Sequence, residues 1–199
     1  IANEYDQLMS AMGAQRTNAF TSFEQTVYTD DVPSSSLDKY LAVQAERFRN
    51  PILRIFHTEL EAVYEEKNRS LDNDGRKVSE ALFSNLFKKH NYGLQTTIGT
   101  VEHLKNPSLI EIRKYFNKYY VPNNMGVILS GDFNPDEVIA KIDKAFSYMQ
   151  PKAIEKYTFE PEAPITAPIT VEIVGPDAES FAIGYRLPGI KDKDALLAS

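Results

Sequence analysis

Two glutamates seven residues apart are the most chemically suggestive feature of the sequence. Glu59 and Glu66 lie in an acidic stretch, residues 56–68, whose apolar spacing is typical of a helix. Seven residues make two helical turns, so both carboxylates are expected on one helical face. A carboxylate on such a face suits direct binding of a cation, or the support of another metal ligand. The alternative is a solvated acidic helix in which Glu65 pairs with Arg69.

The three histidines are the other candidates for chemistry: His57, His90 and His103. No two of them are four residues apart, so neither HExxH nor HxxEH occurs in the 199 residues. His57 and Glu59 are two residues apart and do not share a helical face. We interpret His57 as a helix-start or core residue, and the other two histidines as surface residues. A self-contained active site is therefore not predicted.

A pair of short strands is the second candidate surface. Residues 17–22 and 25–30 are rich in Thr, Phe, Tyr and Val, a pattern that predicts a β-hairpin. The hairpin is either ordinary sheet structure or an edge to which an extended peptide adds through main-chain hydrogen bonds. The residues alone leave both interpretations open.

The composition of the chain argues against some binding partners and some kinds of chemistry. The chain has 199 residues, a formal net charge of −6 and no cysteine. A negative field disfavours nucleic acid as a partner, and the lack of cysteine excludes thiolate catalysis and Cys-ligated metals. No apolar run approaches the roughly 18 residues of a membrane span, so no membrane span is expected.

The order of elements predicts an α+β fold with an antiparallel or mixed sheet backed by helices. Besides the hairpin, strands are expected at 125–130, 170–174 and 180–186. A Pro-rich linker is expected at 151–168, and residues 91–100 are expected to form a loop. Helices are predicted at 2–13, up to 49, at 56–73, 78–90, 108–119 and 135–149. Without an initiator Met and with an unclosed final helix, the chain is expected to be a piece of a longer protein.

Several separate motifs, in this order, resemble the pitrilysin/insulinase family of zinc metallopeptidases, the inverzincins. The motifs are NAFTS at 18–22, ELEAVYEE at 59–66, YG at 92–93, IGT at 98–100, YYVPNNM at 119–125 and GD at 131–132. The resemblance implies repeated α+β domains, each an antiparallel sheet backed by helices. Residues 1–150 would then be most of one insulinase-type peptidase domain, 151–168 a linker, and 169–199 the start of a second, similar domain. A second half or partner subunit of the same family is also implied.

The resemblance also implies roles for four residues. Glu66 matches the third zinc ligand, and Glu59 the acidic residue that supports the site. Asn18 and Ala19 match the strand that pairs with a peptide or unfolded polypeptide substrate. The HxxEH motif, with two zinc-binding histidines and the catalytic glutamate, precedes that strand in the family and is absent here.

These matches predict a fragment of a zinc metalloendopeptidase with no catalytic residue in this chain. The intact parent would bind zinc, whereas the isolated chain would bind no stoichiometric zinc and would be inactive. The alternative is a non-catalytic structural or partner half of the same fold. The habits of the family suggest a bacterial periplasmic or secreted location.

Overall fold

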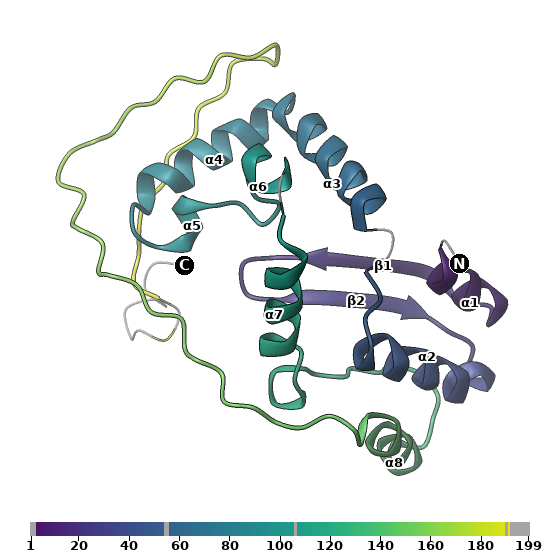
Figure 1. The fold of residues 1–199 in the computed structure, drawn as a ribbon. Coiled ribbons are helices and arrows are strands. Elements are labelled where there is room, and N and C mark those ends of the chain that lie inside the picture. Colours follow the sequence, from purple (N-terminus) through teal and green to yellow (C-terminus); the bar gives the residue numbers. More distant parts are fainter. Residues whose placement is uncertain (1–2, 54–55, 106, 190, 192–199) are drawn as a thin grey trace. The chain divides into compact units, whose positions relative to one another are not determined.

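The computed structural model describes residues 3–53, 56–105, 107–189 and 191, without the side chain of His57 (Figure 1). The described residues form a helix-rich α+β fold with one two-stranded sheet, which confirms the expected fold class. They fall into two compact units, the first from residues 1–59 and 106–156, the second from 60–105 and 157–199. The elements in chain order are α1 (Glu4–Ala11), β1 (Gln15–Thr21), β2 (Thr26–Asp31), a 3₁₀ turn (Ser34–Ser36), α2 (Leu37–Arg49), α3 (Phe56–Leu71), α4 (Asp74–Leu86), α5 (Asn91–Leu94), α6 (Val101–Lys105), α7 (Leu109–Tyr119), a second 3₁₀ turn (Pro122–Asn124) and α8 (Pro135–Phe146).

The predicted hairpin is present in the first unit. β1 and β2 are antiparallel neighbours (Figure 1), with Ala19 opposite Tyr28. The register is irregular between Gln15 and Asn18. α1, which precedes the hairpin, stops as expected at Gly13, whose φ of 78° is a left-handed conformation that favours glycine.

The core of the first unit lies along α2. Leu41 and Gln44 are buried, and α8 packs against this helix. In α8, Val138 is buried and Ile142 and Phe146 are half-buried, whereas Ile139 is 56% exposed. Residues four apart share a helical face, so these three residues form the packed side of α8. Asn134 caps this helix by accepting hydrogen bonds from the amides of residues 136 and 137.

In the second unit, α4 begins where the sequence predicted a break. The Asn73 side chain accepts a hydrogen bond from the Arg76 amide and caps the helix. At the other end of α4, Phe83 and Phe87 stack with ring centroids 6.2 Å apart. The ring of Tyr92, from α5, meets Phe87 edge-on. α5 lies within a stretch expected to be a loop, so that part of the prediction was wrong.

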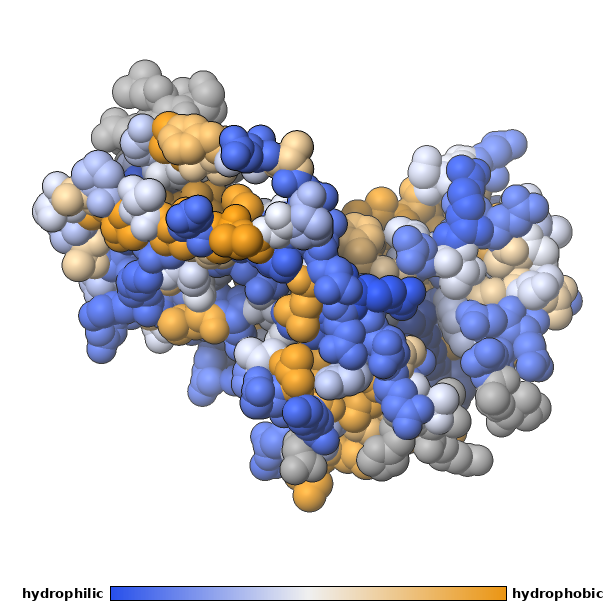
Figure 2. Space-filling model, turned by 90° about the horizontal axis from the view of Figure 1, so that it is seen from above, coloured by the Kyte–Doolittle hydropathy of each residue, from blue (hydrophilic) through white to orange (hydrophobic). Residues whose placement is uncertain are grey.

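Three predicted strands are not formed. Residues 125–130, 170–174 and 180–186 have no strand structure, and Ile128 and Phe181 are 94% and 87% exposed. An apolar run forms a strand only where a neighbouring strand takes up its backbone hydrogen bonds, and no described residue pairs with these segments. Apolar residues accordingly reach the molecular surface (Figure 2). Within the described part of the chain, no helix is long and apolar enough to cross a membrane.

Candidate functional site

The acidic pair identified in the sequence lies on α3. This helix has one packed face, which includes Leu60 and the buried Lys67, and one exposed face. Glu59 and Glu66 both lie on the exposed face, two turns apart. The alternative pairing of Glu65 with Arg69 is not among the ion pairs formed by the described residues. Glu61 and Glu65 are also exposed, so α3 presents four carboxylates to its surroundings.

A buried lysine next to Glu66 links α3 to α4. The Lys67 side chain is 6% exposed, and its Nζ lies 3.4 Å from Glu80 Oε1 on α4. The Ser70 hydroxyl, also buried, donates to the Lys67 carbonyl at 2.6 Å. A buried cation needs its carboxylate partner, so this ion pair stabilises the contact between α3 and α4.

A metal site needs several ligand side chains that lie close together. The described residues contain no cluster of three or more His, Cys, Asp or Glu side chains that could hold a metal ion. Catalytic zinc sites in proteins use three protein ligands. Glu66 fits the chemistry of one such ligand, because it is an exposed carboxylate on a packed helix. The described residues by themselves do not fit a complete zinc site.

The prediction of a surface position is correct for His103 but wrong for His90. His90, expected at the surface, is half-buried: its ring meets Tyr92 and Phe159 edge-on with centroids 4.2 and 4.3 Å apart. Its Nδ1 accepts a hydrogen bond from the Tyr92 amide at 3.1 Å. His103 is exposed, as expected. The interpretation of His57 concerns a side chain outside the described residues.

Asn18 and Ala19 lie side by side on β1, which is exposed along its whole length. The described sheet has two strands, so one edge of β1 carries no neighbouring strand. The Asn18 side-chain Oδ1 accepts a hydrogen bond from the Ala19 amide at 2.9 Å. The sheet edge is thus available, and one of its amides is engaged by a side chain of the same strand.

The hairpin is anchored by the carboxylate of Asp30, at the end of β2. Its Oδ2 accepts hydrogen bonds from the Tyr5 hydroxyl at 2.8 Å, the Tyr40 hydroxyl at 3.2 Å and Gln44 Nε2 at 3.3 Å. Gln44 Nε2 also donates to the Tyr5 hydroxyl at 2.7 Å. One carboxylate oxygen therefore ties β2 to α1 and α2 and fixes the strand pair that carries Asn18.

An arginine and the burial of the tyrosines reinforce this anchor. The Arg47 guanidinium lies 4.5 Å from the ring centre of Tyr5 and 4.3 Å from that of Tyr28. Burial, together with the nearby Asp30 carboxylate, raises the pKa of both Tyr5 and Tyr40 above its ordinary value. The two tyrosines therefore remain protonated at neutral pH and act as hydrogen-bond donors.

A second tyrosine pair joins β2 to the end of α7. The hydroxyls of Tyr28 and Tyr120 are 2.8 Å apart, and the Tyr120 ring stacks on Phe116 with centroids 4.4 Å apart. Burial raises the pKa of Tyr120, and the hydrogen bond to Tyr28 adds to the effect. Sequence patterns did not identify this pair or the Asp30 cluster. The only signal was Gln44, a polar residue on an otherwise apolar stripe of α2.

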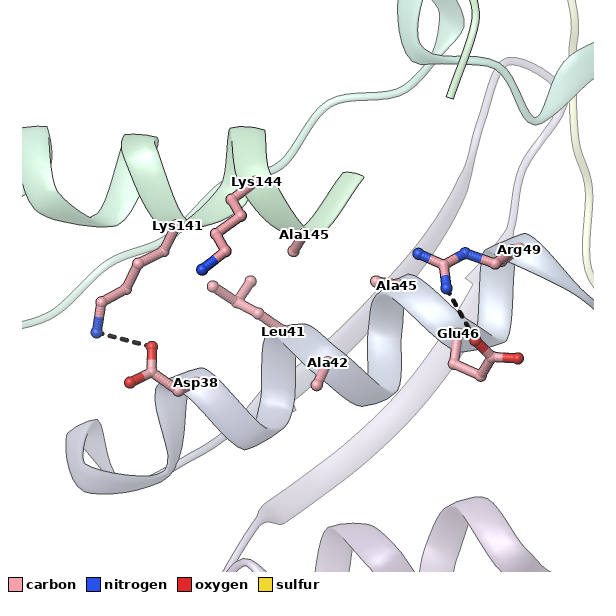
Figure 3. Close-up of a pocket in the computed structure, with 9 residues that line it drawn as sticks. All are labelled: Asp38, Leu41, Ala42, Ala45, Glu46, Arg49, Lys141, Lys144 and Ala145. Atoms are coloured by element: carbon pink, nitrogen blue, oxygen red, sulfur yellow. Dashed lines mark hydrogen bonds and ion pairs between the residues drawn. The ribbon is translucent and has the colours of Figure 1, made fainter. Parts of the chain in front are cut away.

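A groove of about 580 Å³ lies between α2 and α8 in the first unit (Figure 3). An ion pair between Lys141 and Asp38 at 2.7 Å and one between Arg49 and Glu46 at 3.5 Å border it, while Lys144 extends toward its apolar floor. The lining residues are Asp38, Leu41, Ala42, Ala45, Glu46, Arg49, Lys141, Lys144 and Ala145. They include no hydroxyl, thiol or imidazole group, and none of the predicted site residues is among them.

Comparison with known protein families gives two matches that together cover most of the chain. The sequence model described as insulinase (peptidase family M16) matches residues 1–100. The model described as the peptidase M16 inactive domain matches residues 108–199.

Individual proteins agree with these matches. The zinc protease PqqE of Helicobacter pylori is 31% identical over 199 residues, which cover 97% of this chain and 45% of that protein. The mouse insulin-degrading enzyme is 30% identical over 170 residues, covering 81% of this chain and 16% of the enzyme. The chain thus spans less than half the length of these relatives.

Solved structures share the fold. The crystal structure of a protease from Helicobacter pylori is similar with a TM-score of 0.71 at 30% identity, over 78% of this chain and 38% of that one. The first half of the periplasmic protease PqqL from Escherichia coli is similar in fold, with a TM-score of 0.67 at 23% identity, over 78% of this chain and 35% of that one.

Proposed function

The chain belongs to the insulinase family of peptidases, M16, and on that premise we propose that it forms part of a zinc metalloendopeptidase. Glu66 supplies one protein ligand of the zinc, and Glu59 supports the site from two turns away. Asn18 and Ala19 on β1 hold a peptide or unfolded polypeptide as an added strand. The relatives named as zinc proteases support the zinc assignment.

One observation carries this proposal. Glu59 and Glu66 are exposed on a helix that is linked to α4 by the ion pair between the buried Lys67 and Glu80. Two carboxylates two turns apart on a helix suit a metal site when the surrounding structure holds the ligand geometry. When bound, zinc lowers the pKa of its water and polarises a carbonyl.

The HxxEH motif is not in the 199 residues, so the other zinc ligands and the catalytic glutamate would come from outside them. The isolated 199-residue chain is accordingly inactive and binds no stoichiometric zinc. We further infer that residues 1–150 belong to one peptidase domain, 151–168 to a linker and 169–199 to the start of a second. A second half of the same fold is the expected partner, and a periplasmic location is supported by the periplasmic protease PqqL.

Zinc content tests the proposal. In the full-length protein, we expect Glu66→Gln to lose most bound zinc and Glu59→Gln to weaken binding less, by about tenfold. Glu65→Gln is the matched control, because Glu65 is an exposed neighbour on the same helix. Mass spectrometry of the metal in dialysed protein measures all three variants. Equal zinc in the wild type and Glu66→Gln would reject the assignment.

A second candidate function is a non-catalytic structural or partner half. The match of residues 108–199 to a domain described as inactive favours it. Under this alternative the full-length protein carries no zinc and hydrolyses no peptide on its own, while an active subunit of the same family still co-purifies with it. The zinc measurement on the wild-type protein therefore separates the two functions.

A further inference from the structure

In the second unit, the turn between α4 and α5 holds a carboxylate from a distant part of the chain. Glu162 Oε2 accepts a hydrogen bond from the Lys88 amide at 3.0 Å. Its Oε1 accepts from the amides of Lys89 at 2.7 Å and His90 at 2.9 Å. Three consecutive backbone amides thus converge on the two oxygens of one carboxylate.

An arginine completes the site from a third segment. Arg186 Nη1 lies 3.6 Å from Glu162 Oε2 and donates to the Leu86 carbonyl at 2.8 Å. The same guanidinium also donates to the Ala163 carbonyl. The side chains of Glu162 and Arg186 are only 9% and 20% exposed. The carboxylate is therefore enclosed by backbone amides on one side and a guanidinium on the other.

This arrangement has the chemistry of an anion site. Successive amides that point into one concavity bind anions, and hydrogen bonds to a charged acceptor are about twice as strong as neutral ones. Burial raises the pKa of Glu162, but the hydrogen bonds from the three amides and the nearby Arg186 outweigh it and lower this pKa below its ordinary value. The ionised carboxylate is the form that the site holds.

The enclosed carboxylate also closes a loop. Glu162 and Arg186 lie close together at the end of α4, so the loop of residues 163–185 begins and ends at the same place. Farther along, the Asp177 amide donates to Asp74 at the start of α4 at 3.0 Å. A cavity of about 380 Å³ adjoins Glu162 and Arg186, which leaves space beside the turn for a small molecule from solution.

We propose that the turn at residues 88–90, together with Arg186, is a carboxylate-binding site, and that Glu162 is its intramolecular ligand. When Glu162 occupies the site, the two ends of the loop 163–185 are held together. If Glu162 is removed, the site accepts a free carboxylate of similar size. The ligand class is thus a carboxylate, either from this chain or from solution.

Chemical rescue tests this proposal in the full-length protein. Glu162→Ala removes the ligand and leaves its space, and hydrogen exchange reports the protection of the amides at residues 88–90. We expect protection to fall at least tenfold and to recover when sodium acetate is added, but not with sodium chloride at equal ionic strength. Glu160→Ala is the matched control, because the Glu160 side chain is 78% exposed and its ion pair among the described residues is with Lys89. This control should keep its protection.

Three outcomes would overturn the proposal: unchanged protection in a folded Glu162→Ala variant, equal recovery with acetate and chloride, or an equal loss in Glu160→Ala. Should Glu162→Ala fail to fold, Glu162→Gln provides the test. Its amide keeps a carbonyl acceptor but fills the space, so we expect partial loss of protection without acetate rescue. Recovery of this variant with acetate would contradict a site at the position of the Glu162 carboxylate.

Discussion

Asp30 in the first unit and Glu162 in the second are both carboxylates that accept three hydrogen bonds, but their donors differ in origin. Asp30 is held by the side chains of Tyr5, Tyr40 and Gln44, from two different helices. Glu162 is held by three consecutive amides of one turn. The first cluster joins separate elements, whereas the second recognises a group that docks on a locally formed turn. The same number of hydrogen bonds thus has different consequences for folding.

The difference lies in what remains after the carboxylate is removed. Without Asp30, two hydroxyls and a buried amide group lose their acceptor inside packed structure, and each such loss is costly. Without Glu162, the freed amides belong to a turn whose Lys88 and Lys89 are exposed, so water can replace the carboxylate. Asp30 is therefore expected to matter for global stability, and Glu162 for the local attachment of one loop.

The largest effect is expected for Asp30→Ala. We expect it to lower the free energy of unfolding by about 2–4 kcal/mol, because the hydroxyls of Tyr5 and Tyr40 and one N–H of Gln44 lose their acceptor. Asp31→Ala is the matched control: this neighbouring carboxylate is 55% exposed and pairs with the 84% exposed Arg16. Its cost should be below about 0.5 kcal/mol. Urea denaturation measures both, and equal costs would show that the Asp30 cluster does not anchor the hairpin.

Alkaline pH should weaken the same cluster without any mutation. The folded-state pKa of Tyr5 and Tyr40 is raised above the ordinary value of about 10. Their contribution to stability is therefore complete below about pH 10 and is lost as pH rises through the folded-state pKa values. Urea denaturation between pH 8 and 11 should show a fall that Tyr40→Phe reduces. Tyr157→Phe, a substitution outside this cluster, should leave the fall unchanged; an equal reduction would refute the assignment.

Sequence patterns predicted local structure better than pairing across the chain. The hairpin and the helix starts near residues 108 and 135 were predicted because each depends on residues within a few positions of one another. The segment at 125–130 was wrongly predicted as a buried strand, because an apolar run does not specify which strand pairs with it.

The candidate site shows the same limit. The spacing of Glu59 and Glu66 was sufficient to place both on one face of α3, since helical geometry is local. The Asp30 cluster was missed because Tyr5 lies 25 residues from Asp30 and 39 from Gln44, and no periodic pattern links such distances. Contacts of this kind depend on tertiary packing, which a pattern of residue types does not encode.

Acid pH should release Glu162 from the turn at residues 88–90. The pKa of Glu162 is lowered from the ordinary value of about 4.3, so its contribution is complete above that pH and is lost as pH falls through the folded-state pKa. The charged groups around it are Arg186, Lys88, Lys89, and Glu160, with His90 adjacent. The NMR shifts of the three turn amides should move together in one acid titration.

Two variants show which carboxyl group, Glu162 or Glu160, causes the shift of the turn amides. Glu162→Gln should abolish the common shift of the turn amides, because its side chain does not ionise. Glu160→Gln should preserve it, although Glu160 itself also has a pKa lowered by its hydrogen bond to Lys89. A titration that survives Glu162→Gln would assign the shift to another group and break the contrast with Asp30.

The smallest effect is expected when the Lys89–Glu160 pair is removed. Both side chains are largely in solvent, at 46% and 78% exposure, and ion pairs of this kind contribute little because water and salt screen them. Glu160→Gln should therefore change the melting temperature by less than about 1 °C, whereas Glu162→Gln should lower it by about 2–4 °C. Calorimetry at low and high salt measures both. If Glu160→Gln has the larger effect, surface charge rather than the amides of the turn attaches this segment to α4.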